Sequence, residues 1–148
     1  MSGNSIREQI LLAVMAVVRT PVESLGATLH RSPTVAISRE QCPALVVFPE
    51  SESITERAND RVTRELIVRL VALARAVPPA IPETEADRLL TAAHAALLAD
   101  RNLGGLSLGI REQECEWEVE DADAVAVALP ARYSLTYRTL ANDLSTLG

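Results

Sequence analysis

The N-terminal segment carries apolar residues at helical spacing. They recur every three or four positions, as on one face of an amphipathic helix: Ile6, Ile10, Val14 and Val17. Asn4 or Ser5 can cap the start of this helix. Pro21 lacks a backbone donor and clashes with the preceding turn, so we expect the helix to end before it. Thr28–Arg31 then predicts a short strand.

The next segments alternate between apolar and polar runs. Residues 43–49 are β-branched and aromatic and are bounded by Pro43 and Pro49, which predicts a strand whose ends lie outside the ladder. Residues 50–60 are polar, without apolar periodicity, and predict a long hairpin arm or a loop. Residues 62–77 fit a helix by their leucine spacing and a strand by the alternation of their first half. Because a strand and an arm precede them, we expect a strand.

A second helix is predicted over residues 84–99, after a proline-rich break. Thr84 and Asp87 form a short capping box at its start. Its apolar stripe has helical spacing: Ala86, Leu89, Leu90, Ala93, Leu97 and Leu98. Residues 102–105 supply the stop.

The last third of the chain alternates with period two, which predicts strands. Every even position from Glu112 to Glu120 is glutamate, and the apolar odd positions are expected to face inward: Cys115, Trp117 and Val119. After a polar turn at 121–123, a second apolar set continues the pattern: Val125, Val127, Leu129, Tyr133, Leu135 and Tyr137. The two runs predict a β-hairpin. Pro130 predicts a bulge or an edge position in its second strand.

These elements predict an α+β fold with a C-terminal β-hairpin. An antiparallel β-sheet would carry two helices packed on one face. The 148 residues match the usual size of one domain, so residues 1–148 are expected to form a single unit. The longest apolar run, residues 10–18, falls short of the roughly 20 residues that span a bilayer. Without a secretory signal pattern, a cytosolic protein is expected.

Charge and motifs narrow the function classes. A net charge of −6 argues against a protein that grips phosphate backbones. Cys42 and Cys115 lack metal-ligand spacing and are expected to be small buried residues. His30 and His94 lie near no cysteine or paired carboxylate that would suggest a metal site or a triad. We therefore expect no catalytic residues, no cofactor and no metal.

The row of glutamates predicts a surface, and its geometry argues against a metal site. Side chains two apart on a flat strand lie roughly 6.5–7 Å apart and parallel, whereas a cation needs ligands that converge. The row is expected to be a solvated face or a pairing surface on which arginines lie across the carboxylates. The candidate arginines belong to the hairpin itself or to another part of the chain or a second copy: Arg132 and Arg138, or Arg57, Arg61 and Arg69.

Three segments together resemble a known family. They are residues 43–49 (PALVVFP), residues 94–108, which join HAALLAD to LGGLSL, and residues 117–139, which join WEVEDAD to YSLTYRT. In this order they look like the tail terminator, or minor tail, proteins of long-tailed bacteriophages and prophages. Residues 62–77 depart from the family pattern, because they are richer in leucine, alanine and arginine.

The resemblance implies a structural virion protein. It would form a homo-hexameric ring that caps the head-proximal end of the tail tube, stops its polymerisation and joins the tail to the head or neck. Its partners would be itself, the tail tube protein and a head-completion or neck protein, in the host cytoplasm during assembly and then in the virion tail. The residues expected at these contacts come from the arm and the glutamate row: Glu52, Glu56, Arg57, Arg61, Glu112, Glu114, Glu116 and Glu118.

Other functions stay open at this point. A different head–tail joining, neck or tail completion component belongs to the same broad class. A small ligand-binding or enzymatic α+β domain would need a site assembled from scattered residues. A regulatory module of a bacterial host is a further alternative.

Overall fold

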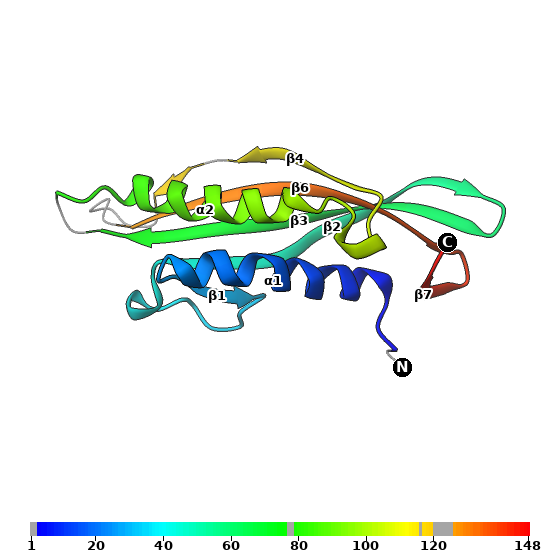
Figure 1. Ribbon diagram of the computed structural model, residues 1–148, viewed down its shortest axis with the longest axis horizontal. Coiled ribbons are helices and arrows are strands. Elements are labelled where there is room, and N and C mark those ends of the chain that lie inside the picture. Colours follow the sequence, from blue (N-terminus) through cyan, green and yellow to red (C-terminus); the bar gives the residue numbers. More distant parts are fainter. Residues whose placement is uncertain (1–2, 77–78, 116, 120–125) are drawn as a thin grey trace.

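The computed structural model describes residues 3–76, 79–115, 117–119 and 126–148, and it has an α+β fold (Figure 1). The helices are α1 (Ile6–Ser24) and α2 (Pro82–Ala99). The strands are β1 (Thr28–Arg31), β2 (Ala44–Ala58), β3 (Arg61–Arg75), β4 (Gly109–Cys115), β5 (Glu118–Val119), β6 (Ala126–Leu140) and β7 (Asp143–Leu147). The predicted fold class is confirmed.

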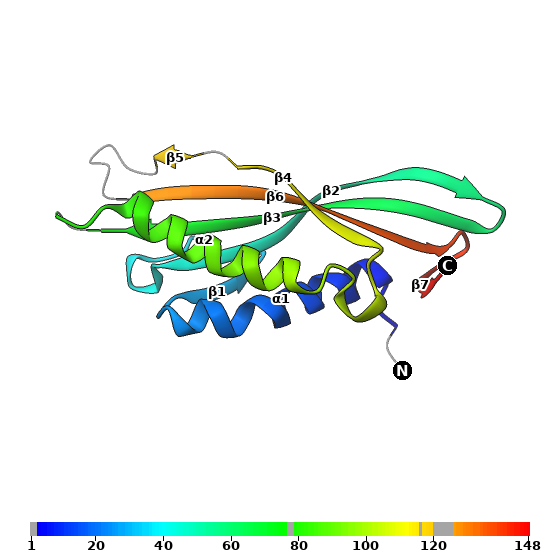
Figure 2. The ribbon, with the colours of Figure 1, turned by 45° about the horizontal axis from the view of Figure 1, so that its top comes forward.

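The strands form one sheet with the order β1-β2-β3-β6-β4, and β5 and β7 also pair with β6. All of these pairings are antiparallel except β1 with β2, which makes the sheet mixed. Both helices lie on one side of the sheet, as predicted (Figures 1 and 2). The strand predicted at Thr28–Arg31 is confirmed, and the Arg31 guanidinium ties it to α1 through two hydrogen bonds to the Glu8 carboxylate, at 2.5 and 2.7 Å.

Helix α1 begins as predicted and ends later than predicted. The Ser5 hydroxyl accepts a hydrogen bond from the Glu8 amide at 3.0 Å, so Ser5 is the cap. The helix continues through Pro21 to Ser24, which corrects the expected end. Val22, in the turn that follows the proline, is fully buried against the core. We attribute the extra turn to this packing, which compensates for the hydrogen bond that Pro21 cannot make.

Helix α2 starts two residues before the predicted cap. Pro82 takes the first helical position, where its fixed φ and missing amide cost nothing, and Ile81 is the capping residue without a side-chain hydrogen bond. Thr84 is therefore inside the first turn, and the capping box predicted with Asp87 is wrong. The predicted apolar stripe is confirmed, since its central residues are buried: Ala86, Leu89, Leu90, Ala93 and Leu97.

Strands β2 and β3 form a long hairpin. Its outer part, which contains residues 50–60, is the arm. The strand interpretation of residues 62–77 is confirmed as far as Arg75, and residue 77 lies outside the described residues. Strand β2 was expected to end at Pro49, but it continues to Ala58. Its register with β3 shifts between Pro49 and Ser51 and between Ile54 and Glu56. Such bulges accommodate the missing donor of a proline. The arm extends beyond the helices at one end of the molecule, where both termini also lie (Figures 1 and 2).

Strand β6 pairs with β3 on one side and with β4 and β5 on the other, and its end pairs with β7. Its apolar alternation is confirmed, because the described members of the predicted set are all buried: Val127, Leu129, Tyr133, Leu135 and Tyr137. Its pairing with β3 runs through Pro130 without a bulge. On the other side, β4 pairs as far as Ala131 and β5 pairs with Val127 and Ala128, so Pro130 lies between the two partners. The missing amide of the proline is thus placed where the neighbouring ladder is interrupted.

Candidate interaction surfaces

The glutamate row is split by a bulge in β4. Glu112 pairs with Tyr133 of β6, whereas Glu114 pairs with Arg132, the preceding residue of β6. A register shift of one residue at Gln113 therefore places the two carboxylates on opposite faces of the sheet. The expectation of a single glutamate face is wrong for this pair. Glu116 and Glu120 lie outside the described residues, and only the backbone of Glu118 is described, in β5.

Cys115 and Trp117, two of the odd positions in the glutamate row, are less buried than the alternation predicts. Cys115 is exposed, and the Trp117 side chain is 50% exposed. Both belong to the helix side of the sheet, where they line a groove beside α2. The expected burial of Cys115 and Trp117 is wrong because β4 is an edge strand that α2 leaves uncovered. Val119 pairs with Val127, and nothing further is described of its side chain.

On the face away from the helices, the carboxylates pair with arginines of the same chain. Arg132 lies 3.8 Å from Glu114 and 2.9 Å from Glu50. The Arg69 Nε atom lies 3.4 Å from Glu50 without hydrogen-bond geometry, and its guanidinium stacks 5.2 Å from the centre of the Phe48 ring. The hairpin's own Arg132 thus lies across Glu114, as one prediction had it. Arg138 instead donates a 3.1 Å hydrogen bond to Thr63.

Glu52 joins three elements at the base of the arm. Its carboxylate lies 3.1 Å from Arg7 Nε of α1 and 3.6 Å from Arg64 Nη1 of β3. The Tyr137 hydroxyl of β6 donates a short hydrogen bond to the same carboxylate. We call these four residues the Glu52 cluster. Glu52 was expected at an interface, and it lies in a half-buried network inside the chain.

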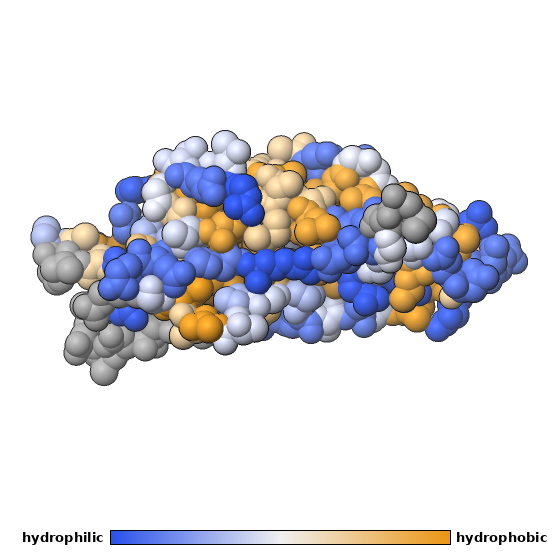
Figure 3. Space-filling model, turned by 90° about the horizontal axis from the view of Figure 1, so that it is seen from below, coloured by the Kyte–Doolittle hydropathy of each residue, from blue (hydrophilic) through white to orange (hydrophobic). Residues whose placement is uncertain are grey.

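The outer part of the arm is open to solvent. Glu56, Arg57 and Arg61 are exposed, and Arg61 pairs with the adjacent Asp60 at 2.8 Å. Glu56 and Arg57 make no side-chain hydrogen bond or ion pair with the described part of the chain. Asn59 turns the hairpin with a φ of 58°, a conformation that asparagine tolerates. Figure 3 views the molecule from the side where α1 and β1 lie, and it shows a hydrophilic band that reaches the end of the molecule that carries the arm.

A groove of about 290 Å³ lies between α2 and the β4–β5 edge. We call it the α2–β4 groove, and it is lined by Asp87, Leu90, Thr91, His94, Glu112, Cys115, Trp117, Leu129 and Tyr133. His94 Nδ1 and the Tyr133 hydroxyl form a 2.8 Å hydrogen bond at its base. Sequence reasoning missed this groove, because His94 and Glu112 are brought together only by the packing of α2 on β6.

The two tyrosines of the chain have perturbed acidities. Burial and the hydrogen bond to Glu52 raise the pKa of Tyr137 from 10.0 to about 12. Burial, with Glu112 and Cys115 nearby, raises the pKa of Tyr133 as well. Both hydroxyls are thus held in the neutral form to a higher pH than in an unfolded chain.

We expect the tyrosinate absorbance of the folded protein to rise only as the pH approaches about 12, and in denaturant to rise near 10.0. Between these values the unfolded chain binds fewer protons, so the free energy of unfolding should fall as the pH increases. Ultraviolet titration measures this directly, because the chain has only two tyrosines. The Tyr137→Phe variant isolates Tyr133. Coincident titrations in the folded and denatured protein would contradict the prediction.

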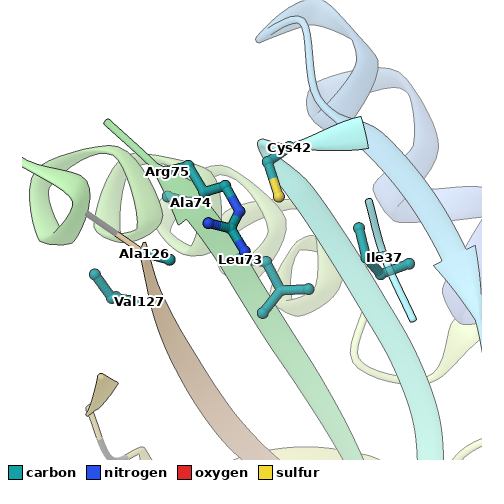
Figure 4. Close-up of a pocket in the computed structure, with 7 residues that line it drawn as sticks. All are labelled: Ile37, Cys42, Leu73, Ala74, Arg75, Ala126 and Val127. Atoms are coloured by element: carbon teal, nitrogen blue, oxygen red, sulfur yellow. The ribbon is translucent and has the colours of Figure 1, made fainter. Parts of the chain in front are cut away.

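The remaining candidate residues show no constellation for chemistry. His30 Nε2 makes a 2.8 Å hydrogen bond with the Thr28 hydroxyl. Cys42 is half-buried, and its sulfur and the Arg75 guanidinium point into a small cavity of about 40 Å³ (Figure 4). That volume holds little more than one water molecule. Within the described residues, no three His, Cys, Asp or Glu side chains are grouped so as to hold a metal ion.

Comparisons with known proteins give a structural likeness only. No protein-family model and no curated protein matches the chain. In the described residues, no helix is long and apolar enough to span a membrane. Among solved structures, the chain is similar to one from the virion of a native gene transfer agent particle, with a TM-score of 0.53 and 11% sequence identity. The match covers 85% of this chain and 92% of that chain, so the two share a fold.

Proposed function

We propose that this chain is a structural virion assembly protein that caps the head-proximal end of a phage tail tube. In this role it stops polymerisation of the tube and joins the tail to the head or neck. The observation that carries the proposal is the fold shared with a virion chain over 85% of this chain and 92% of that one. The sequence resemblance to tail terminator proteins points to the same class.

The shape of the molecule supports assembly in a ring. A closed ring needs two unlike surfaces on each subunit that meet head to tail. The exposed arm lies at one end of the molecule, and the edge formed by β4 and β5 runs along the remaining length of the molecule (Figure 2). We propose that the exposed residues of these surfaces lie at subunit or tube contacts: Glu56, Arg57, Arg61, Glu112 and Glu114. Glu52 supports the arm from within.

The test is assembly with tail tube protein from the same phage or prophage. We expect native mass spectrometry to show a six-fold species in the presence of tubes or at high concentration. Electron microscopy should show that added protein stops tube growth at one end and is bound there. A protein that stays monomeric, both alone and with tube protein, would overturn the proposal. Binding to the neck without any effect on tube length would identify the alternative, a neck or tail completion component.

A further inference from the structure

The α2–β4 groove has the chemistry of a site for a planar cation. Asp87 and Glu112 bring two exposed carboxylates to its rim, and no arginine is among its lining residues. Trp117 adds a half-exposed indole, the best aromatic surface for a cation. A guanidinium stacks on indole and binds carboxylates through its planar fork, which an ammonium group cannot do as well. The volume of about 290 Å³ is at the lower limit of small-molecule pockets, which suits a single side chain.

The arm presents such a cation. Arg57 is exposed on the outer part of the arm and has no ion-pair or hydrogen-bond partner within the described part of the chain. Arg61, the other arginine of the arm tip, is already paired with Asp60. Ile54 on the same arm is 44% exposed and can add apolar contact. Among the arginines of the arm, Arg57 is therefore the one available for a carboxylate elsewhere.

Arg57 and the groove belong to opposite parts of the molecule. The arm extends from one end, while α2 and β5 lie toward the other end in both views (Figures 1 and 2). They cannot meet within one copy of the chain. We propose that the arm of one copy docks on the α2–β4 groove of a second copy, with Arg57 placed between Trp117 and the carboxylates of Asp87 and Glu112. This contact is heterologous, and it rests on the ring of the proposed function.

Disulfide trapping tests the contact with a thiol that the chain already has. Cys115 lines the groove, and Cys42→Ser removes the other cysteine of the chain. Adding Arg57→Cys should then give disulfide-linked oligomers on mild oxidation, with residues 57 and 115 joined in the cross-linked peptide. Thr20→Cys, at an exposed position of α1, is the matched control and should give few. Equal cross-linking in both proteins, or no 57–115 peptide, would overturn the proposal.

Charge reversal gives a second test that does not depend on thiol chemistry. Arg57→Glu should weaken self-association about tenfold or more, because it places a third carboxylate at the acidic groove. Glu112→Arg should weaken it similarly, and the two changes together should restore most of the affinity. Arg101→Glu changes an exposed arginine outside the arm and should have little effect. Absence of rescue in the double variant, measured by sedimentation, would count against the contact.

These results separate the contact from the proposed function. If tubes are capped but no 57–115 cross-link forms, the ring uses other surfaces and this inference is wrong. If the cross-link forms but tube growth is unaffected, the contact stands and the tail-capping role fails. A chain that stays monomeric at every concentration overturns both.

Discussion

Replacing Leu11 with alanine is expected to lower the free energy of unfolding by about 2–5 kcal/mol. Leu11 is 2% exposed and belongs to the core between α1 and the sheet. The substitution removes three carbon atoms, two methyl groups and the methine that carries them, and leaves a cavity that close-packed neighbours fill only in part. Because alanine favours helix at least as well as leucine, the loss measures packing and not helix propensity. Urea denaturation gives the value directly.

Leu12 provides the matched control for this variant. It is the next residue of the same helix, but its side chain is 47% exposed. Leu12→Ala should change the free energy of unfolding by less than about 0.5 kcal/mol, as most surface substitutions do. Equal losses at the two positions would show that α1 does not pack through the face that contains Leu11.

The parts of the fold that the sequence predicts best are governed by local periodicity. The α2 stripe around Leu90 and Ala93 follows from helical spacing, and the buried faces of β6 follow from period two. Neither needs knowledge of a distant partner. The secondary structure of residues 62–77 is harder to predict from the sequence, because their composition favours a helix. The segment forms strand β3 because it pairs with β2 on one side and with β6 on the other.

The errors have physical causes that a single segment does not show. The bulge at Gln113 changes which face Glu112 and Glu114 occupy, and it depends on the register with β6. A strict alternation in sequence therefore does not give a strict alternation in space. The end of α1 was misplaced because burial of Val22 outweighs the local cost of Pro21.

The environments of the candidate interface residues follow only in part from the sequence. The exposed positions of Glu56 and Arg57 on the arm follow from the polar run at residues 50–60. The Glu52 cluster could not be predicted, since the residues that contact Glu52 include Arg7, 45 positions away, and Tyr137, 85 positions away. Only the packing of α1 and β6 around the base of the arm brings them together.

This cluster leads to the second large effect, which is expected from Glu52→Gln. The change should lower the free energy of unfolding by about 1–3 kcal/mol. The Arg64 side chain is only 11% exposed, so loss of the facing carboxylate leaves a poorly solvated cation near a second one, Arg7. The Tyr137 hydroxyl, which is buried, also loses a charged acceptor. Glu56→Gln, on the exposed part of the same arm, should cost less than about 0.5 kcal/mol.

The same variant shows how the arm is held. The Glu52 cluster links the base of the arm to α1, so its loss should raise amide hydrogen exchange in the outer parts of β2 and β3 more than in the buried start of β2 at Ala44 and Leu45. If the arm must be held in a fixed direction to reach a second copy, Glu52→Gln should also weaken self-association without changing any exposed residue of the arm tip. Unchanged exchange in the arm would mean that sheet pairing alone fixes its direction.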